Sequence, residues 1–209
     1  MDDVPVRTAG IRDREALRAR LHRAGGDIDH EGWLLGDEGH DRATGERRPA
    51  AVLLGLVDRP AGPCIILTQR TAHLRDHAGQ ISLPGGSMEP EDAGPADAAL
   101  REALEEIGLA PAKVELLGGL RHYDTITGFR IHPVIGWIEP PVALRPDPYE
   151  VAEVFELPLG FALDPANHRR DSYDRNGVRR HFYVLPFENR YIWGATAGIL
   201  VNFARLLAD

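Results

Sequence analysis

The sequence predicts an α/β (α+β) fold in which a mixed β-sheet lies between helices. Two observations support this. Runs of strand-like apolar residues recur from residue 50 onward, and two segments with helical spacing of apolar residues interrupt and close the series. The chain has 209 residues, of which 43% are hydrophobic and 27% are charged. That composition is ordinary for a globular protein with a sizeable core.

The strand-like segments are bounded by turn residues rich in glycine and proline. We expect strands at 50–57, 64–70, 114–125, 130–139, 150–159, 180–188 and 190–194. A loop at 71–86 ends in the glycine pair Gly85–Gly86, and helices are expected at 95–107 and 195–207. Pro95 suits the first turn of its helix and Gly108 suits its end. The C-terminal helix is expected in the core, and a contribution to a homodimer surface is left open.

The N-terminal part of the chain lacks the strand-like apolar runs that recur from residue 50 onward. Residues 10–24 are expected to form a short helix with a thin apolar stripe, ended by Gly25–Gly26. A polar connector follows. We therefore divide the chain into an N-terminal helix and connector arm, 1–49, and a main domain, 50–209.

Charge and composition exclude several function classes. A formal net charge of −8 argues against a general nucleic-acid binder, which needs clustered positive charge. The single cysteine, Cys64, cannot form an internal disulfide. No apolar run reaches the length that spans a bilayer, and the N-terminus lacks the pattern of a secretion signal. We expect a cytoplasmic protein with a small-molecule partner and neither nucleic acid nor membrane.

The segment 95–107 places three glutamates, Glu102, Glu105 and Glu106, on one short helix. Like charges at these spacings repel by a few tenths of a kcal/mol per pair, roughly. A divalent cation such as Mg²⁺, which prefers carboxylate oxygens, more than offsets that cost. We interpret the cluster as a metal site, with a solvated acidic helix face as the alternative. Leu100, Leu104 and Ile107 are expected on the opposite side of the helix.

These residues resemble the Nudix box, whose usual pattern is G-x5-E-x7-R-E-U-x-E-E-x-G-U, with U apolar. The second half of the pattern matches in full over 101–109, "REALEEIGL". The first half departs from it. Five residues separate Gly86 from Asp92, which stands where the pattern has glutamate, and eight residues rather than seven separate Asp92 from Arg101.

The stretch upstream of the box, "LTQRTAHLRDHAGQISLPGG", resembles the signature of the coenzyme A pyrophosphatase branch of that family. The lengthened box is similar to that branch too. The resemblance covers about residues 50–205, and it implies a Nudix-type α/β/α sandwich. It also implies hydrolysis of the pyrophosphate bond of coenzyme A to 3′,5′-ADP and 4′-phosphopantetheine.

The resemblance further implies Mg²⁺ or Mn²⁺ as cofactor and an activated water as nucleophile. Glu102 and Glu106 are then the principal metal ligands, with the Gly86 carbonyl as a further one. Glu105 is a ligand or orients Arg101. Glu102, Glu150 and Glu153 are the candidates for the catalytic base.

Substrate-binding candidates lie before and within the glycine pair. Arg70 and Arg75 suit the phosphates of coenzyme A, and surface ion pairs are the alternative. His77 is interpreted as a loop hydrogen-bond partner, and Gly79 as a turn residue. Gly85 lets the backbone approach a ligand closely.

Other interpretations remain open at this stage. Trp137, Tyr191 and Trp193 are expected to pack in the core or at its rim, with adenine stacking as the alternative. The enzyme alternative is a Nudix hydrolase for another nucleoside diphosphate derivative, such as ADP-ribose or a damaged nucleotide. The alternative of a different class is a non-catalytic nucleotide sensor.

Overall fold

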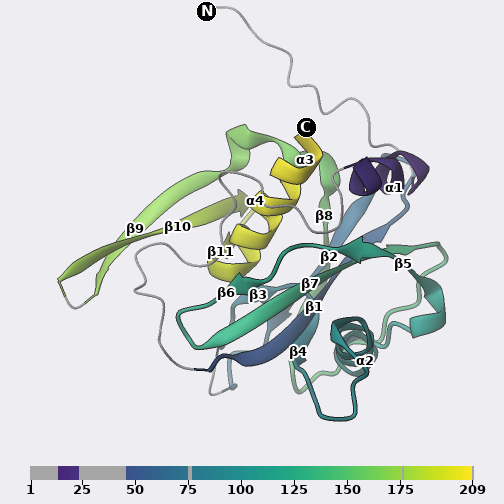
Figure 1. The fold of residues 1–209 in the computed structure, drawn as a ribbon, viewed down its shortest axis with the longest axis horizontal. Helices are drawn as coiled ribbons and strands as arrows, with labels where there is room; N and C mark the ends of the chain where they lie inside the picture. The colour runs from purple at the N-terminus through teal and green to yellow at the C-terminus, as the bar shows by residue number, and fades with distance from the viewer. Residues whose placement is uncertain (1–13, 24–45, 75–76, 176, 209) are drawn as a thin grey trace, which may run out of the picture.

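A computed structural model describes residues 14–23, 46–74, 77–175 and 177–208 (Figure 1). The helices and strands of the first half of the chain are α1 (Arg14–Arg23), β1 (Arg48–Val57), β2 (Cys64–Arg70), β3 (Ile81–Ser82), β4 (Gly85–Ser87) and α2 (Pro95–Ile107). Those that follow are β5 (Val114–Gly119), β6 (Tyr123–Asp124), β7 (Phe129–Ile138), β8 (Val151–Pro158), α3 (Leu159–Leu163), β9 (Arg169–Arg175), β10 (Val178–Phe187), β11 (Arg190–Trp193) and α4 (Gly194–Ala208). Short 3₁₀ turns at Pro111–Lys113 and Pro165–Asn167 complete the described elements.

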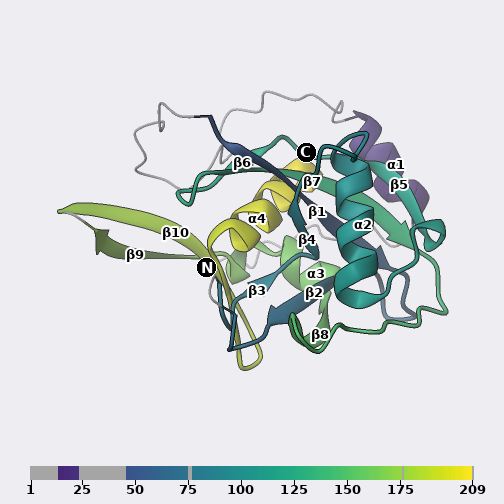
Figure 2. The same ribbon diagram turned by 90° about the horizontal axis from the view of Figure 1, so that it is seen from below.

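The main sheet is mixed and is organised around β1. Its path runs β3–β2–β1–β7–β5, with β8 added to β2, β6 to β7 and β4 to β1. The β1–β7 pair is parallel, and α2 lies in the connection between these two strands. On one side of β1, β2 pairs only with the C-terminal residues Leu56 and Val57. The N-terminal part of β1 therefore pairs with β4, which runs antiparallel to Ala50–Val52. This arrangement places β4 directly beside α2 (Figure 2).

Two apolar layers cover the two faces of the sheet. Alternate residues of β1 point to opposite sides: Ala51 and Leu53 join the layer under α2, whereas Leu54 and Leu56 join the layer under α1, α3 and α4. This alternation follows from the two-residue period of a strand. Figures 1 and 2 show α2 on one side of the sheet and α4 on the other. The predicted mixed sheet between helices is confirmed.

A second, three-stranded sheet has the order β11–β10–β9. One side of it contributes the buried residues Leu185 and Ile192 to the core that contains α4. The β9–β10 ribbon extends away from the body of the molecule (Figure 1). The sequence "RRDSYDR" of β9 is polar and charged. Because it has no run of apolar residues, the pattern of apolar residues does not predict a strand there.

The helix at 95–107 has the predicted bounds, and Gly108 ends it in a left-handed conformation with φ of 66°. The expected apolar face was wrong in one respect: Leu104 is 46% exposed, whereas Glu106 is only 4% exposed. The buried face of α2 consists mainly of Ala98, Ala99, Ala103 and Ile107. These small residues let the helix approach the sheet closely enough to bring Glu106 inward. The expected loop at 71–86 also contains the short strands β3 and β4.

The described part of the N-terminal segment packs on the main domain. Leu17 and Leu21 of α1 are buried in the same layer as α4. Arg14 bonds Glu115 of β5 at 2.8 Å and Glu139 at 3.0 Å. The expected helix start before residue 14 and the connector 24–45 lie outside the described residues. The boundary at residue 50 stays a prediction.

The C-terminal helix α4 is core, as expected, with buried residues on every side from Thr196 to Leu207. Within the described residues, none of the helices combines the length and the apolar character needed to cross a membrane.

Gly198 of α4 provides a test of how tightly this helix packs. A Cβ at Gly198 would lie 2.6 Å from Cε2 of buried Tyr123 in β6. Gly160 of α3 is also helical, and a Cβ there would meet nothing within 4 Å. Overpacking costs about 1–3 kcal/mol, so Gly198→Ala should be less stable than Gly160→Ala by about that amount. Urea unfolding of both variants measures the difference, and equal stabilities would contradict the packing described.

Candidate active site

The site is built where β4 runs between β1 and α2. Gly85 has φ of +154°, and a Cβ there would lie 2.3 Å from the Ala51 carbonyl oxygen. A Cβ at Gly86 would lie 2.5 Å from Oε1 of Glu102. The glycine pair therefore permits two close approaches that other residues obstruct. The backbone of Gly85 lies tightly on β1, and the Glu102 carboxylate rests against Gly86.

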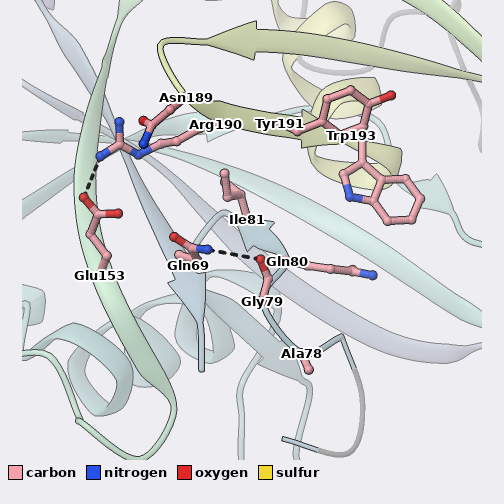
Figure 3. Close-up of a pocket in the computed structure, with 10 residues that line it drawn as sticks. All are labelled: Gln69, Ala78, Gly79, Gln80, Ile81, Glu153, Asn189, Arg190, Tyr191 and Trp193. Carbon is pink, nitrogen blue, oxygen red and sulfur yellow. Dashed lines mark hydrogen bonds and ion pairs between the residues drawn. The ribbon is translucent and has the colours of Figure 1, made fainter. Parts of the chain in front are cut away.

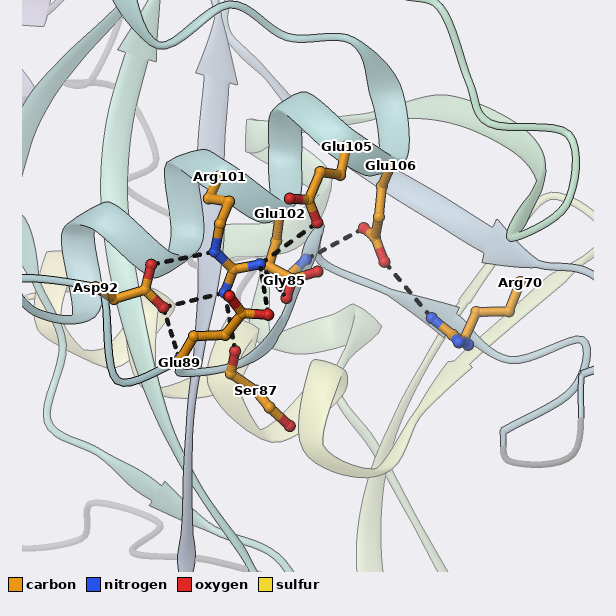
Figure 4. A network of polar contacts seen from close by, with 9 residues as sticks. All are labelled: Arg70, Gly85, Ser87, Glu89, Asp92, Arg101, Glu102, Glu105 and Glu106. Carbon is orange, nitrogen blue, oxygen red and sulfur yellow. Dashed lines mark hydrogen bonds and ion pairs between the residues drawn. The ribbon is translucent and has the colours of Figure 1, made fainter.

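Arg101 links the loop before α2 to the acidic residues on α2 (Figure 4). Its Nε and Nη2 donate to the two oxygens of Asp92 at 3.1 and 3.0 Å, and Nη2 also donates to the Ser87 carbonyl at 3.1 Å. Its Nη1 donates to Glu102 at 3.0 Å and to Glu105 at 3.4 Å. The guanidinium holds the pKa of Asp92 below its usual range. A fork of this kind fixes both partners in orientation.

These contacts assign a structural role to Asp92. Compared with the Nudix pattern, this chain has aspartate in place of glutamate and one extra residue before Arg101. The Asp92 carboxylate still reaches Arg101 with both oxygens. The segment 87–92 is thereby anchored to α2. The sequence alone pointed to the departure at Asp92 but not to its partner.

Glu106 is a buried carboxylate with incomplete charge compensation. Burial raises its pKa to about 7, while the Gly85 N–H, which donates to Oε2 at 3.2 Å, and nearby Arg70 act in the opposite direction. Nη1 of Arg70 lies 3.5 Å from Glu106 Oε1, and Nη2 lies 4.0 Å from Glu150 Oε2. The negative charges of Glu102 and Glu150 also contribute to the raised pKa of Glu106. A cation at this point would compensate what Arg70 does not.

The donor set fits Mg²⁺ or Mn²⁺. Burial also raises the pKa of Glu102, which Arg101 partly offsets. Among the described residues, no three His, Cys, Asp or Glu side chains already surround one point at ligand distance. Mg²⁺, however, is commonly bound by one or two carboxylates together with water and substrate phosphate oxygens. Glu102 and Glu106, beside the backbone of the glycine pair, match that kind of site.

The structure places the other predicted acids in different surroundings. Glu105 is 59% exposed and lies on the solvent side of Arg101. Glu150 lies near Arg70 and close enough to affect Glu102 and Glu106 electrostatically. Glu153 lines the pocket described below, where its carboxylate accepts a 2.5 Å bond from Nη2 of Arg190.

The predicted substrate residues are divided between this group and a nearby pocket. Arg70 belongs to the acidic group, whereas Gly79 lines the pocket. His77 holds Gln80 through a 2.8 Å contact between Nδ1 and Oε1. Arg75 lies outside the described residues. Of the three aromatic candidates, Trp137 is buried, while Tyr191 and Trp193 are partly exposed.

The pocket has a volume of about 500 Å³ and lies beside the end of β2 (Figure 3). It is lined by Gln69, Ala78, Gly79, Gln80, Ile81, Glu153, Asn189, Arg190, Tyr191 and Trp193. Sequence reasoning did not single out Gln69, Gln80, Asn189 or Arg190. The sequence pointed to this region through Gly79, Glu153 and the two aromatic residues Tyr191 and Trp193, which occupy alternate positions of a strand.

The family model and the sequence relatives agree on the family. The model of the NUDIX domain matches residues 46–175. The uncharacterized Nudix hydrolase NudL of Escherichia coli K12 is 42% identical over 164 residues, covering 78% of this chain and 85% of NudL. NudL of Shigella boydii has the same identity and coverage. Among solved structures, the Nudix hydrolase RenU of M. smegmatis is 25% identical, with a TM-score of 0.47 over 62% of this chain and 81% of RenU.

Gly86→Ala tests whether the glycine positions Glu102 for a metal. The added Cβ would displace the Glu102 carboxylate, which lies 2.5 Å from its position. We expect Mn²⁺ affinity to fall by about tenfold or more, as for changes that misplace a ligand. Stability should change by about 1 kcal/mol or less, because the carboxylate is the mobile end of a side chain. Gly94→Ala, whose Cβ meets nothing within 4 Å, is the control, and an equal effect of both variants on Mn²⁺ affinity would refute the assignment.

Glu106→Gln tests the buried charge through the pH dependence of stability. The folded-state pKa of about 7 exceeds the ordinary 4.5, so the folded state binds more protons between these values. Stability from this group therefore falls as pH rises through that window. Without divalent metal, Glu106→Gln should gain about 1–3 kcal/mol relative to the wild type on going from about pH 5 to about pH 8. Urea unfolding in chelator measures this, with the exposed Glu139→Gln as control, and a pH-independent difference would contradict it.

Proposed function

Because the chain belongs to the Nudix hydrolase family, we propose that it hydrolyses the pyrophosphate bond of coenzyme A or its derivatives. The products would be 3′,5′-ADP and 4′-phosphopantetheine, or its acylated form. The family match covers residues 46–175 and establishes a hydrolase that acts on a small-molecule nucleoside diphosphate derivative. The narrower choice of coenzyme A rests on residues 67–86 and their placement.

The observation that carries the proposal is the buried Glu106 carboxylate, held between the Gly85 N–H and Arg70. Such a charge is costly unless a cation shares it. When bound, Mg²⁺ or Mn²⁺ would neutralise the diphosphate and lower the pKa of a coordinated water. Glu102 and Glu106 would hold the cation, with the Gly86 carbonyl as a further ligand. Arg101 keeps Glu102 oriented through its contacts to Asp92 and Ser87.

Arg70 is placed to bind a substrate phosphate. Its guanidinium lies between Glu106 and Glu150, and its Nε is buried without a hydrogen-bond partner among the described residues. Once a cation compensates Glu106, Arg70 can turn its donors toward a phosphate oxygen. The motif residue Arg70 thus stands at the border between the metal ligands and the substrate.

Glu150 is the better placed of the two later glutamates for the role of general base. Its carboxylate lies near Arg70, whereas Arg190 engages Glu153 on the pocket side. Glu102 remains the other candidate, because it is half of the proposed ligand pair. A base must lie within hydrogen-bond reach of the water it deprotonates, and this requirement favours groups beside the acidic cluster.

A substrate panel tests the proposed reaction. Purified protein is incubated with Mn²⁺ and coenzyme A, ADP-ribose or an oxidised nucleoside triphosphate, and the products are separated by chromatography. We expect coenzyme A to be cleaved with the highest kcat/KM and to give 3′,5′-ADP. Consumption of ADP-ribose while coenzyme A stays intact would overturn the substrate assignment, and turnover of none of them would favour the non-catalytic sensor.

Glu106→Gln should reduce hydrolysis at saturating substrate by at least about 100-fold, because it removes a proposed metal ligand while keeping the side-chain volume. Glu139→Gln, at an exposed position paired with Arg14, is the matched control and should retain wild-type activity. Full activity of Glu106→Gln would show that the ligand assignment is wrong.

A further inference from the structure

The pocket beside β2 has features that the metal chemistry does not use. Its volume of about 500 Å³ falls in the range of small-molecule sites. In Figure 3 its lining extends from Glu153, Asn189 and Arg190 at one end to Gln80 and Trp193 at the other, with Gln69 and Ile81 between. The two ends differ in chemistry, and this difference restricts what the pocket can take.

At the charged end of the pocket, both terminal nitrogens of Arg190 are paired with carboxylates, and its Nε is buried without a hydrogen-bond partner among the described residues. Arg190 donates at 2.5 Å to Glu153 and at 2.5 Å to Glu188. It is the only arginine or lysine among the ten described residues that line the pocket. A phosphate subsite needs cationic donors that are available to the ligand. The pocket therefore suits an uncharged group better than a phosphate.

The opposite end presents aromatic rings that are partly open to solvent. Trp193 is 37% exposed and receives Phe182 edge-on, with ring centroids 5.6 Å apart. The phenol of Tyr191 donates to Asp171 at 3.0 Å, which fixes the orientation of its ring. Rings held in place but not covered offer a stacking surface for a flat, π-bonded ligand.

Side-chain amides face the same space. Gln69 Nε2 donates to the Gly79 carbonyl at 3.4 Å, and Gln80 Oε1 is held by His77 at 2.8 Å. The amide of Asn189 makes no hydrogen bond with the described residues. An amide offers a donor and an acceptor side by side, which matches the edge of a purine such as adenine.

Neighbouring residues of β2 belong to the pocket and to the acidic group. Gln69 directly precedes Arg70, and the Arg70 N–H donates to the Gln80 carbonyl at 2.9 Å. The last residues of β2 thus contribute Gln69 to the pocket and Arg70 to the group around Glu106. Because successive residues of a strand point to opposite faces of a sheet, a ligand that contacts both Gln69 and Arg70 must pass around the end of β2, with its flat neutral part in the pocket and its diphosphate at Arg70.

We propose that this pocket is the nucleobase subsite of the enzyme. Trp193 stacks on the adenine, the amides of Gln69, Gln80 and Asn189 contact its edge, and the diphosphate extends past Arg70 toward Glu102 and Glu106. The proposal rests on the proposed function, in that the base belongs to the adenosine half of the substrate. Gly79 serves as a wall of the subsite.

Metal-free binding tests the proposal without turnover. Adenosine 5′-phosphate, ribose 5-phosphate and pantetheine are titrated in chelator by calorimetry. The tryptophan fluorescence that the wild type has and Trp193→Phe lacks is a second readout. We expect adenosine 5′-phosphate to bind at least about tenfold more tightly than ribose 5-phosphate, within the range of base–aromatic stacking. Trp193→Ala should remove that advantage, and Trp193→Phe should keep part of it. Tyr173→Ala, an equally exposed ring on the same small sheet that does not line the pocket, should leave it unchanged.

The outcomes separate the two proposals. Equal binding of adenosine 5′-phosphate and ribose 5-phosphate, or an advantage that survives in a folded Trp193→Ala variant, overturns the subsite. Loss of pantetheine binding alone in Trp193→Ala also overturns it and assigns the pocket to the other half of coenzyme A. If base binding depends on Trp193 while coenzyme A is not cleaved, the subsite stands and the proposed reaction fails.

Discussion

The close approach of β4 to β1 and α2 is the constraint on which the site depends. Gly85 and Gly86 remove the side chains that would separate this strand from the Ala51 carbonyl and from the Glu102 carboxylate. With the strand in place, the Gly85 N–H reaches Glu106, and the two glutamates share a narrow region bordered by backbone. Their mutual repulsion is tolerated because the packing of β1, β4 and α2 determines their positions. Arg70 and Arg101 relieve this repulsion only in part.

Arg101 and Arg70 compensate the acidic group in different ways. Arg101 contacts Asp92, Ser87, Glu102 and Glu105 and so serves as a permanent structural link. Arg70 makes longer contacts, at 3.5 Å to Glu106 and 4.0 Å to Glu150, so its guanidinium is held less tightly by its carboxylate partners. This difference separates an arginine that orients ligands from one that can exchange carboxylate partners for a phosphate. The two roles reflect where the arginines lie. Arg101 is part of α2, which carries the glutamates, whereas Arg70 is the last residue of β2.

Much of the Nudix-type α/β/α sandwich follows from local sequence pattern. The strand β1, its neighbours β2 and β7, and the helix α2 are apolar or strongly periodic, and their predicted positions are confirmed. Four features could not be predicted from the sequence and are seen only in the structure. The strand β9 is built from arginine and aspartate and pairs only because β10 lies beside it. The exposure of Leu104 and the burial of Glu106 depend on the alanine face of α2. The partner of Asp92 depends on how a loop of altered length closes. The pocket unites residues from four separate segments, and no spacing in the sequence predicts such a set.

The most direct test of the account is a Mn²⁺ titration of chelator-treated protein by electron paramagnetic resonance, which reports free Mn²⁺. The account predicts that the wild-type protein removes Mn²⁺ from solution and that a folded Glu102→Gln/Glu106→Gln variant does not. Equal Mn²⁺ binding by both proteins would contradict the claim that these two carboxylates form the metal site.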